Sequence, residues 1–160
     1  MTDTPPVEPR FGTDGLRGKA GEPPLDAPTL RRVSAALGIW LQQAGPERKR
    51  VLIGHDGRAS ASWIRHALIE GLAATGASAT DLGLVTTPAL AFTTRIEPFV
   101  AGIMISASHN PASDNGIKIF DSRGFKLPDQ MEADLESMLD DKDINRIRPT
   151  RSAVGKAFRI

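Results

Sequence analysis

The stretch from residue 100 to 120 constrains the fold most, because it places a long polar loop between two segments of strand composition. The first segment, Val100–Ile105, is a continuous apolar run, and the second, Ile117–Phe120, alternates apolar residues with one lysine. Runs of this kind predict strands. The residues between them show no hydrophobic periodicity, and Asn115-Gly116 predicts a turn, because both residue types tolerate positive φ. Long polar loops at strand ends are often functional.

Five residues of the loop carry groups that suit chemistry: the hydroxyls of Ser106 and Ser108, the imidazole of His109, the amide of Asn110 and the carboxylate of Asp114. Ser108 next to His109 suggests a nucleophile and a base, but the side chains of adjacent residues usually diverge, so spacing alone does not make them a catalytic pair. A turn whose hydroxyls cap backbone groups explains the same residues equally well. Residue chemistry also leaves open whether Ser106 or Ser108 is the reactive hydroxyl.

Elsewhere, helix patterns with one apolar face alternate with short apolar runs, which predicts parallel strands joined by right-handed crossovers. The strand after the polar loop is expected to return antiparallel. The predicted fold class is therefore α/β, with a mixed, mostly parallel sheet and one antiparallel strand. The expected helices are 25–45, 60–76, 87–93 and 128–140, and the expected strands are 51–54, 77–84, 100–105, 117–120 and 125–127.

Two further polar segments are candidates for the same site. His55-Asp56-Gly57-Arg58 follows a predicted strand, and in such sheets the chemistry gathers beyond the carboxyl ends of the strands. The glycine-rich segment 11–18 predicts a tight loop in which backbone can approach another group, although a plain surface turn has the same composition. Arg17, Arg58 and Lys118 lie in or beside these polar segments, as phosphate-binding cations do. A solvated strand lysine is the other interpretation of Lys118.

Length and composition limit the domain organisation and the classes of function. The 160 residues suit one domain with its own core, and we expect a loose N-terminus at 1–9, a domain at 10–141, and a linker or the start of a second domain at 142–160. A formal net charge of +1 gives no case for a nucleic-acid partner, and no apolar run is long enough to span a membrane. The absence of cysteine excludes disulfides and thiolate zinc sites and fits a cytoplasmic location.

Three segments, taken in order, resemble the α-D-phosphohexomutases. They read FGTDGLRG at 11–18, GHDGRAS at 54–60 and GIMISASHNPASDNGIKIF at 102–120. The resemblance runs through nearly the whole chain, and the last segment is similar to the family's phosphoserine loop, which is a highly specific motif. The form of the first segment and the closing residues 154–157 look most like the aminosugar members of the family. The fold that this resemblance implies is a three-layer α/β/α first domain.

The resemblance implies a mutase reaction in which a phosphoryl group passes through Ser108. The phosphoserine would interconvert glucosamine 6-phosphate and glucosamine 1-phosphate through a bisphosphate intermediate, with Mg²⁺ on the phosphoserine oxygens and a sugar bisphosphate as activator. Arg17 and Lys118 would stabilise charge or move protons, and His109 would line the catalytic site. The residues that the resemblance assigns to the substrate and its phosphate are Thr13, Asp14, Gly15, Arg58, Asn110, Asp114 and Asn115.

The family is built from four domains, and this chain is similar to the first. The Asp-Gly-Asp loop that supplies metal carboxylates belongs to the family's second domain and has no counterpart in this sequence. The expected partners are therefore a phosphosugar and the remaining domains of a longer enzyme, without nucleic acid or membrane. Two alternatives stay open: a domain that binds a phosphosugar or a protein without turnover, and a mutase for mannose or glucose phosphate. We expect the 160-residue chain to fold but not to complete the reaction alone.

Overall fold

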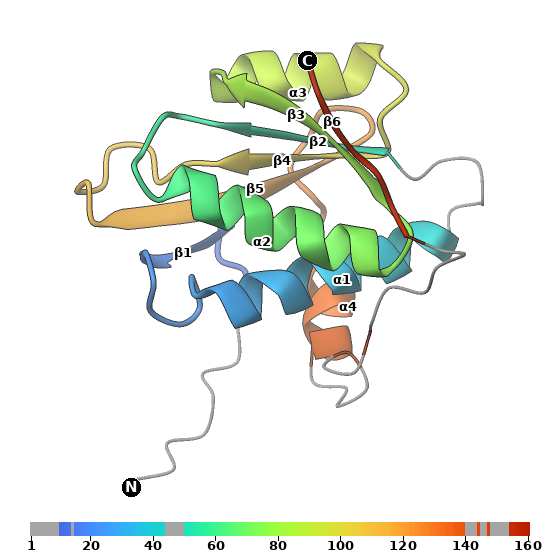
Figure 1. Ribbon diagram of the computed structural model, residues 1–160, viewed down its shortest axis with the longest axis horizontal. Helices are drawn as coiled ribbons and strands as arrows, with labels where there is room; N and C mark the ends of the chain where they lie inside the picture. The colour runs from blue at the N-terminus through green and yellow to red at the C-terminus, as the bar shows by residue number, and fades with distance from the viewer. Residues whose placement is uncertain (1–9, 14, 44–49, 140–143, 145–146, 148–153) are drawn as a thin grey trace, which may run out of the picture.

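The computed structural model describes residues 10–13, 15–43, 50–139, 144, 147 and 154–160. The described strands form one six-stranded sheet in the order β1-β5-β4-β2-β3-β6, with helices on both sides (Figure 1). The strands are β1 (Leu16–Lys19), β2 (Arg50–His55), β3 (Ser78–Leu84), β4 (Ala101–Ile105), β5 (Asp114–Asp121) and β6 (Ala157–Arg159). The helices are α1 (Ala27–Gln43), α2 (Ala61–Ala74), α3 (Thr87–Ile96) and α4 (Asp129–Leu139).

The apolar residues form two cores, one on each face of the sheet. Helices α1, α2 and α4 cover one face, and along α1 the buried residues recur at helical spacing, at Leu30, Val33, Leu37 and Leu41. Helix α3 covers the other face, where Leu90 packs in a smaller core. The sheet is thus buried between two helical layers, and this explains why strand β4 is apolar along its whole length. The expected three-layer α/β/α architecture is confirmed.

The strand directions bring two polar segments together at the carboxyl ends of two neighbouring parallel strands, β2 and β4. Strands β2, β3, β4 and β6 pair in parallel, and β5 pairs antiparallel with both β4 and β1. Among the described strands, β5 alone runs against the others, which confirms the predicted mixed, mostly parallel sheet. His55 at the end of β2 lies opposite Ile105 at the end of β4. The polar residues after these two strands therefore emerge side by side, where such sheets carry their sites.

One prediction of a turn is wrong. Asn115 and Gly116 lie inside β5, so the loop between β4 and β5 is shorter than expected. Glycine is required at position 116 for a different reason than positive φ: a Cβ there would lie 2.8 Å from the Ser106 carbonyl oxygen and 2.9 Å from that of Leu16. The residue type that indicated a turn serves instead to let three backbone segments approach one another closely.

The segment predicted as a tight glycine-rich loop contains a strand that the sequence did not reveal. Leu16–Lys19 forms β1 and pairs antiparallel with residues 114–117 of β5. The segment has little strand composition of its own, and its pairing partner lies about a hundred residues further along the chain. By contrast, the strand expected at 125–127 is reduced to a single bridge between Lys126 and Phe120.

The expected domain boundaries stay predictions, because residues 1–9 and most of 142–153 lie outside the described part of the chain. Within the segment expected to be a linker or the start of another domain, Ala157–Arg159 forms β6 at the edge of this same sheet, beside β3. Of the helices that the structure describes, none combines the length and the apolar character needed to cross a membrane.

Candidate functional site

The candidate site is built on the ends of β2 and β4. The Asp56 amide donates to the Ile105 carbonyl at 3.2 Å, which continues the strand pairing by one residue. Ser106 Oγ donates to Asp56 Oδ2 at 2.7 Å. The Ser106 amide donates to the Gly116 carbonyl at 2.9 Å, so β5 is tied to the same point. These contacts fix the base of the polar loop 106–113, called the Ser108 loop below.

The structure distinguishes the two serines that the sequence left as equals. Ser106 is 8% exposed, and its hydroxyl both donates to Asp56 and accepts from the Ser108 amide at 3.0 Å. Ser108 is exposed, with a φ of +56° in the left-handed region that residues other than glycine rarely adopt. It borders an open pocket of about 420 Å³ that is also lined by Asp56, Arg58, Asn110 and Ala112. Ser106 also lines a pocket, of about 320 Å³, but of the two residues Ser108 is the more exposed.

His109 does not form a close pair with Ser108. Its Nδ1 lies 3.4 Å from Ser108 Oγ, and both residues are exposed. A base that takes a proton usually lies within about 3.2 Å of its donor, so this contact does not by itself activate the serine. Phosphoryl transfer depends mainly on positioning and electrostatic stabilisation, and an activated nucleophile is not essential to it. The catalytic role of His109 stays a prediction.

Arg58 follows β2 and reaches across to the Ser108 loop. Its Nε donates to Asp56 Oδ2 at 3.1 Å. Its two terminal nitrogens donate to four backbone carbonyls of the neighbouring loop and strand: Pro111 at 2.6 Å, Asp114 at 3.0 Å, Ser108 at 2.9 Å and Asn110 at 2.9 Å. A guanidinium group has five N–H donors. The five contacts of Arg58 match that number.

Asn110, Asp114 and Asn115, which the resemblance assigns to phosphate binding, take part in hydrogen bonds with other residues of the protein. Asn110 Nδ2 donates to Asp114 Oδ2 at 3.1 Å. Asn115 is fully buried; its Nδ2 donates to Ser60 Oγ at 2.8 Å, and its Oδ1 accepts the Gly116 amide at 2.8 Å. These bonds join the loop to β5 and to the start of α2. The phosphate-binding roles of the three residues stay predictions.

Arg17 and Lys118 lie on neighbouring strands and share one face of the sheet. Lys118 pairs with Met104, which belongs to the core beneath α3, so Lys118 is on the α3 side. Arg17 pairs with Gly116, and its Cγ lies 2.9 Å from the position that a Gly116 Cβ would take. Because residues 116 and 118 project to the same side of β5, Arg17 shares the face of Lys118. Strand β5, which carries Lys118, lies next to β4, the strand that leads into the Ser108 loop, and β1, which carries Arg17, lies on the other side of β5.

The glycine-rich segment 11–18 packs its backbone closely against β5 and lines a pocket that differs from the one beside Ser108. Gly15 has a φ of +87°, and a Cβ there would lie 2.2 Å from the Ile117 carbonyl oxygen and 3.2 Å from Lys118 Cα, so glycine allows the chain to cross β5 at this point. Thr13 is exposed and lines a pocket of about 440 Å³ beside α4, apart from the residues that line the Ser108 pocket. Asp14 lies outside the described residues.

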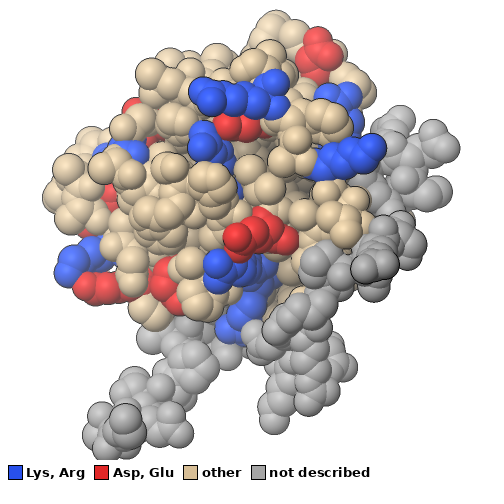
Figure 2. Space-filling view, viewed as in Figure 1, with Lys and Arg blue, Asp and Glu red and all other residues tan. Residues whose placement is uncertain are grey.

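The described residues do not complete a magnesium site. Nowhere among them do three or more His, Asp or Glu side chains gather closely enough to hold a metal ion. Ser108, through its phosphate, is the one predicted ligand that this chain offers. Basic and acidic side chains lie interspersed on the face shown in Figure 2, so that face has no field of a single sign to steer a charged ligand.

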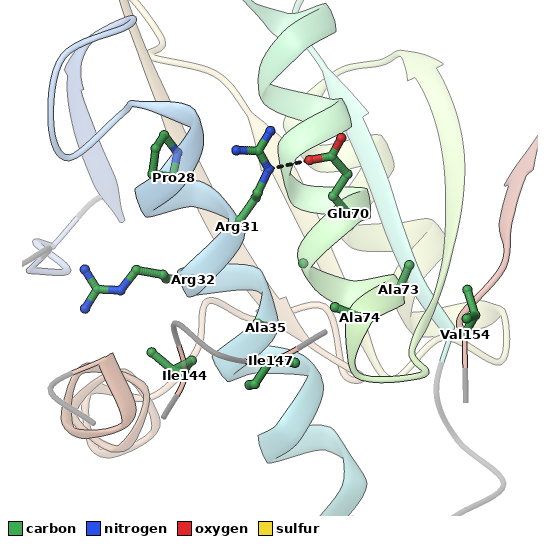
Figure 3. Close-up of a pocket in the computed structure, with 11 residues that line it drawn as sticks. Pro28, Arg31, Arg32, Ala35, Glu70, Ala73, Ala74, Ile144, Ile147 and Val154 are labelled. Carbon is green, nitrogen blue, oxygen red and sulfur yellow. Dashed lines mark hydrogen bonds and ion pairs between the residues drawn. The ribbon is translucent and has the colours of Figure 1, made fainter. Parts of the chain in front are cut away.

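A pocket of about 590 Å³ lies elsewhere, between α1 and α2 (Figure 3). Its walls include small and aliphatic side chains such as Ala35, Ala73 and Ile144, and Arg31 forms an ion pair with Glu70 across it. Its lining residues include none from the Ser108 loop. The candidate chemistry therefore does not lie in this hollow.

Two residues of the site lie within segments that were predicted to belong to it, but neither was assigned a role from the sequence. Asp56 accepts from Ser106 Oγ and from both the amide and the Nε of Arg58. Its place directly after a predicted strand was the available signal. Ser60 accepts from Asn115, 55 residues further along the chain, and was expected only to begin a helix. A contact over that separation leaves no local pattern.

Comparisons with known proteins identify the family that has this fold. The family model for phosphoglucomutase/phosphomannomutase, alpha/beta/alpha domain I, matches residues 8–146. The chain is 44% identical over 150 residues to the phosphoglucosamine mutase of Thermodesulfovibrio yellowstonii, covering 94% of this chain and 33% of the relative. It is 49% identical over 140 residues to that of Solibacter usitatus, covering 86% and 30%. The chain thus spans about a third of the length of the curated relatives it matches.

Solved structures give the same result for the fold. A phosphoglucomutase/phosphomannomutase family protein from Burkholderia thailandensis has a TM-score of 0.79 with this chain at 25% sequence identity. The match covers 96% of this chain and 33% of that one. The described strands and helices therefore form a fold that recurs as one third of a longer protein.

Proposed function

Because this chain belongs to the phosphoglucomutase/phosphomannomutase family, as its α/β/α domain I, we propose that it supplies the phosphoserine of a phosphosugar mutase. The observation that carries the proposal is the contrast between two hydroxyls. Ser106 Oγ is held between Asp56 and the Ser108 amide, whereas Ser108 is exposed beside an open pocket. A residue that gives and receives a phosphoryl group must be reachable by its substrate, and Ser108 meets this condition.

The proposed reaction transfers a phosphoryl group between Ser108 and a sugar phosphate. In the first step a free sugar hydroxyl oxygen bonds to phosphorus, the bond from phosphorus to Ser108 Oγ breaks, and the hydroxyl proton leaves to a base. Ser108 Oγ takes up a proton as it leaves. In the second step Ser108 Oγ gives that proton to a base as it bonds to the phosphorus of the other phosphoryl group, the bond from that phosphorus to the sugar oxygen breaks, and the sugar oxygen takes up a proton. Fixed geometry and charge stabilisation supply most of the acceleration in such transfers.

The neighbouring side chains have proposed roles in the same reaction. Lys118 and Arg17 share a face beside the Ser108 loop, and they stabilise negative charge or move protons there. His109 lines the site next to the serine. Mg²⁺ is the proposed cofactor: the Ser108 phosphate would help to hold it, the other ligands would come from the rest of a complete enzyme, and the ion would offset negative charge on the phosphoryl group. The proposed sugar is glucosamine phosphate, because the relatives at 44% and 49% identity are both named phosphoglucosamine mutase.

The test is an assay of the complete gene product with glucosamine 6-phosphate and mannose 6-phosphate, in the presence of Mg²⁺ and a sugar bisphosphate. We expect a higher kcat/KM for glucosamine 6-phosphate and loss of conversion in Ser108→Ala. Ser137→Ala is the matched control, because Ser137 is an exposed serine on α4 outside the site. Undiminished conversion by Ser108→Ala would exclude the phosphoserine role, and a higher kcat/KM for mannose 6-phosphate would overturn the choice of sugar.

The 160-residue chain on its own is expected to fold without turning over substrate. Two separate cores on the faces of the sheet support folding. The described residues provide no cluster that could hold a metal, and the chain corresponds to about a third of its relatives. The same assay, run on the isolated chain, checks this. Turnover close to that of the complete gene product would show that these residues contain a complete site.

A further inference from the structure

We propose that Arg58 is a positioning residue, whose guanidinium holds the backbone of the Ser108 loop so that the Ser108 hydroxyl stays presented to the pocket. The proposal rests on the proposed function insofar as it concerns the serine that carries the phosphoryl group. It differs from the phosphate-binding role that the resemblance assigns to Arg58. Two observations support it: the N–H donors of Arg58 are all directed at protein acceptors, and the backbone of Ser108 has a left-handed φ. A second Asp-x-Arg motif in the chain provides a control.

The guanidinium of Arg58 has its donors directed at protein acceptors. One goes to the Asp56 carboxylate and four go to backbone carbonyls, which together account for all five N–H groups. An arginine that binds phosphate does so with a fork of N–H donors. A phosphate could use Arg58 only by displacing carbonyls of the loop. The side chain is 13% exposed, which limits access to it further.

Arg58 contacts the backbone of Ser108, the residue proposed to carry the phosphoryl group. The Ser108 carbonyl accepts from Arg58 Nη2 at 2.9 Å, and the Ser108 amide donates to Ser106 Oγ at 3.0 Å. Asp56 connects the two groups that bind the Ser108 backbone, because its Oδ2 accepts from both Ser106 Oγ and Arg58 Nε. A left-handed φ at a residue other than glycine persists only where the surroundings determine it. The amide and the carbonyl of Ser108 are thus both held by hydrogen bonds, and neither bond uses the Ser108 hydroxyl.

The chain offers a matched control for this arrangement. Arg123 stands two residues after Asp121, and its amide donates to Oδ1 at 2.9 Å and its Nε to Oδ2 at 2.8 Å, as Arg58 does with Asp56. Arg123 lies past the far end of β5, and its side chain is 70% exposed. Lysine keeps the charge but has three donors on one nitrogen instead of a planar fork. Arg58→Lys and Arg123→Lys therefore test the same chemical change in two settings.

The first measurement is backbone amide hydrogen exchange on the 160-residue chain, which does not depend on any activity. In Arg58→Lys we expect the amides of Ser108, Asn110 and Asp114 to exchange about tenfold faster or more, while amides of α1 keep their rates. Arg123→Lys should leave the loop unchanged. Ser106→Ala is a second variant, which should accelerate the Ser108 amide even if Arg58→Lys fails to fold. Unchanged loop exchange in Arg58→Lys, or no acceleration of the Ser108 amide in Ser106→Ala, would overturn the proposal. So would equal acceleration in α1 and the loop.

The second measurement separates positioning from phosphate binding in the complete gene product. A misplaced reacting group commonly costs about a hundredfold in rate, so Arg58→Lys should lower kcat by about that factor, with the KM for the phosphosugar within about threefold of wild type. If Arg58 instead bound the phosphate of the substrate, Arg58→Lys would raise KM and leave kcat unchanged, and the rise in KM would be limited because lysine keeps the positive charge. That second pattern would overturn the positioning role.

The two measurements also separate this inference from the proposed function. If the complete gene product does not interconvert sugar phosphates, and Arg58→Lys still loosens the loop selectively, then the mutase assignment fails and the structural role of Arg58 holds. If conversion is observed and both kcat and loop exchange are unchanged in Arg58→Lys, then the mutase assignment holds and the inference fails.

Discussion

Two Asp-x-Arg motifs in this chain have the same local geometry and different surroundings. In Asp56-Gly57-Arg58 the arginine amide lies 3.2 Å from Oδ1 and its Nε lies 3.1 Å from Oδ2. In Asp121-Ser122-Arg123 the corresponding distances are 2.9 Å and 2.8 Å. The local sequence is therefore sufficient to set the contacts between the arginine and its own aspartate.

The difference lies at the far end of each guanidinium group. Arg58 is 13% exposed and meets four carbonyls of a loop 50 or more residues away. Arg123 is 70% exposed; beyond Asp121 it approaches the Phe125 ring, with Cζ 5.9 Å from the ring centroid. Exposed ion pairs contribute little to stability, whereas a buried charge that loses its partner is costly. Topology, which brings β4 next to β2, therefore gives Arg58 backbone contacts that Arg123 is not seen to make.

The largest expected difference between the motifs is in the free energy of unfolding. Arg58→Ala removes the cation of Asp56 and the donors of four carbonyls, so we expect a loss of about 2–4 kcal/mol. Arg123→Ala removes an exposed side chain and should cost less than about 0.5 kcal/mol. Denaturant unfolding of both variants measures the two losses. Equal losses would mean that the loop contacts of Arg58 add nothing to the stability of the fold.

A smaller difference is expected when each aspartate becomes asparagine. Asp121 Oδ1 accepts the amides of Arg123 and Phe125, which an amide oxygen can also accept. Its Oδ2 accepts from the guanidinium of Arg123, but that side chain is 70% exposed and can turn to solvent when an NH₂ group replaces Oδ2, so Asp121→Asn should cost less than about 0.5 kcal/mol. Asp56 Oδ2 accepts from Arg58 Nε and Ser106 Oγ, and an NH₂ group there would face a donor. Asp56→Asn should therefore cost about 1–2 kcal/mol in the same unfolding experiment. A larger loss in Asp121→Asn would reverse the comparison.

The smallest expected effect concerns pH and falls on Lys126, which follows the second motif in the chain. Burial lowers the pKa of Lys126, but the hydrogen bond and charge of Glu132, together with Asp129, outweigh it and raise the pKa above its usual 10.5. A raised folded-state pKa means that this stabilisation is fully present below pH 10.5 and is lost as the pH rises through the folded-state pKa.

Lys126→Met checks this sign. The stability difference between wild type and Lys126→Met should be constant from pH 6 to about pH 9 and should shrink as the pH rises above about 10.5. A Lys126 contribution that grows above pH 10.5 would contradict the direction of the pKa shift.

The same contrast between local and distant contacts explains how much could be predicted from the sequence. The alternation of helix and strand, the mixed sheet and the position of the Ser108 loop follow from apolar periodicity and were predicted. Asn115-Gly116 was predicted as a turn, because its composition does not reveal that β1 and Ser106 approach Gly116 closely. Strand β1 was missed because it forms only by pairing with β5, about a hundred residues further along the chain.

Within the site, the sequence located the loop but not the arrangement of its hydrogen bonds. It placed Arg58 and Ser108 in two polar segments without showing that one holds the backbone of the other. It also left Ser106 and Ser108 equivalent, since both are serines in one loop. Their difference arises because Asp56, 50 residues earlier, lies where it can accept from Ser106. Contacts of this kind depend on strand order, which no local window of sequence contains.

The central claim is that Ser108, and not Ser106, carries the phosphoryl group, and the most direct measurement is the position of the phosphate. The complete gene product is incubated with glucosamine 1,6-bisphosphate, and intact-mass and fragmentation spectra are recorded for wild type, Ser108→Ala and Ser106→Ala. We predict one phosphate on Ser108 in the wild type, none on Ser106 in Ser108→Ala, and phosphate still confined to Ser108 in Ser106→Ala. Phosphate on Ser106 with Ser108 unmodified in the wild type would contradict the account.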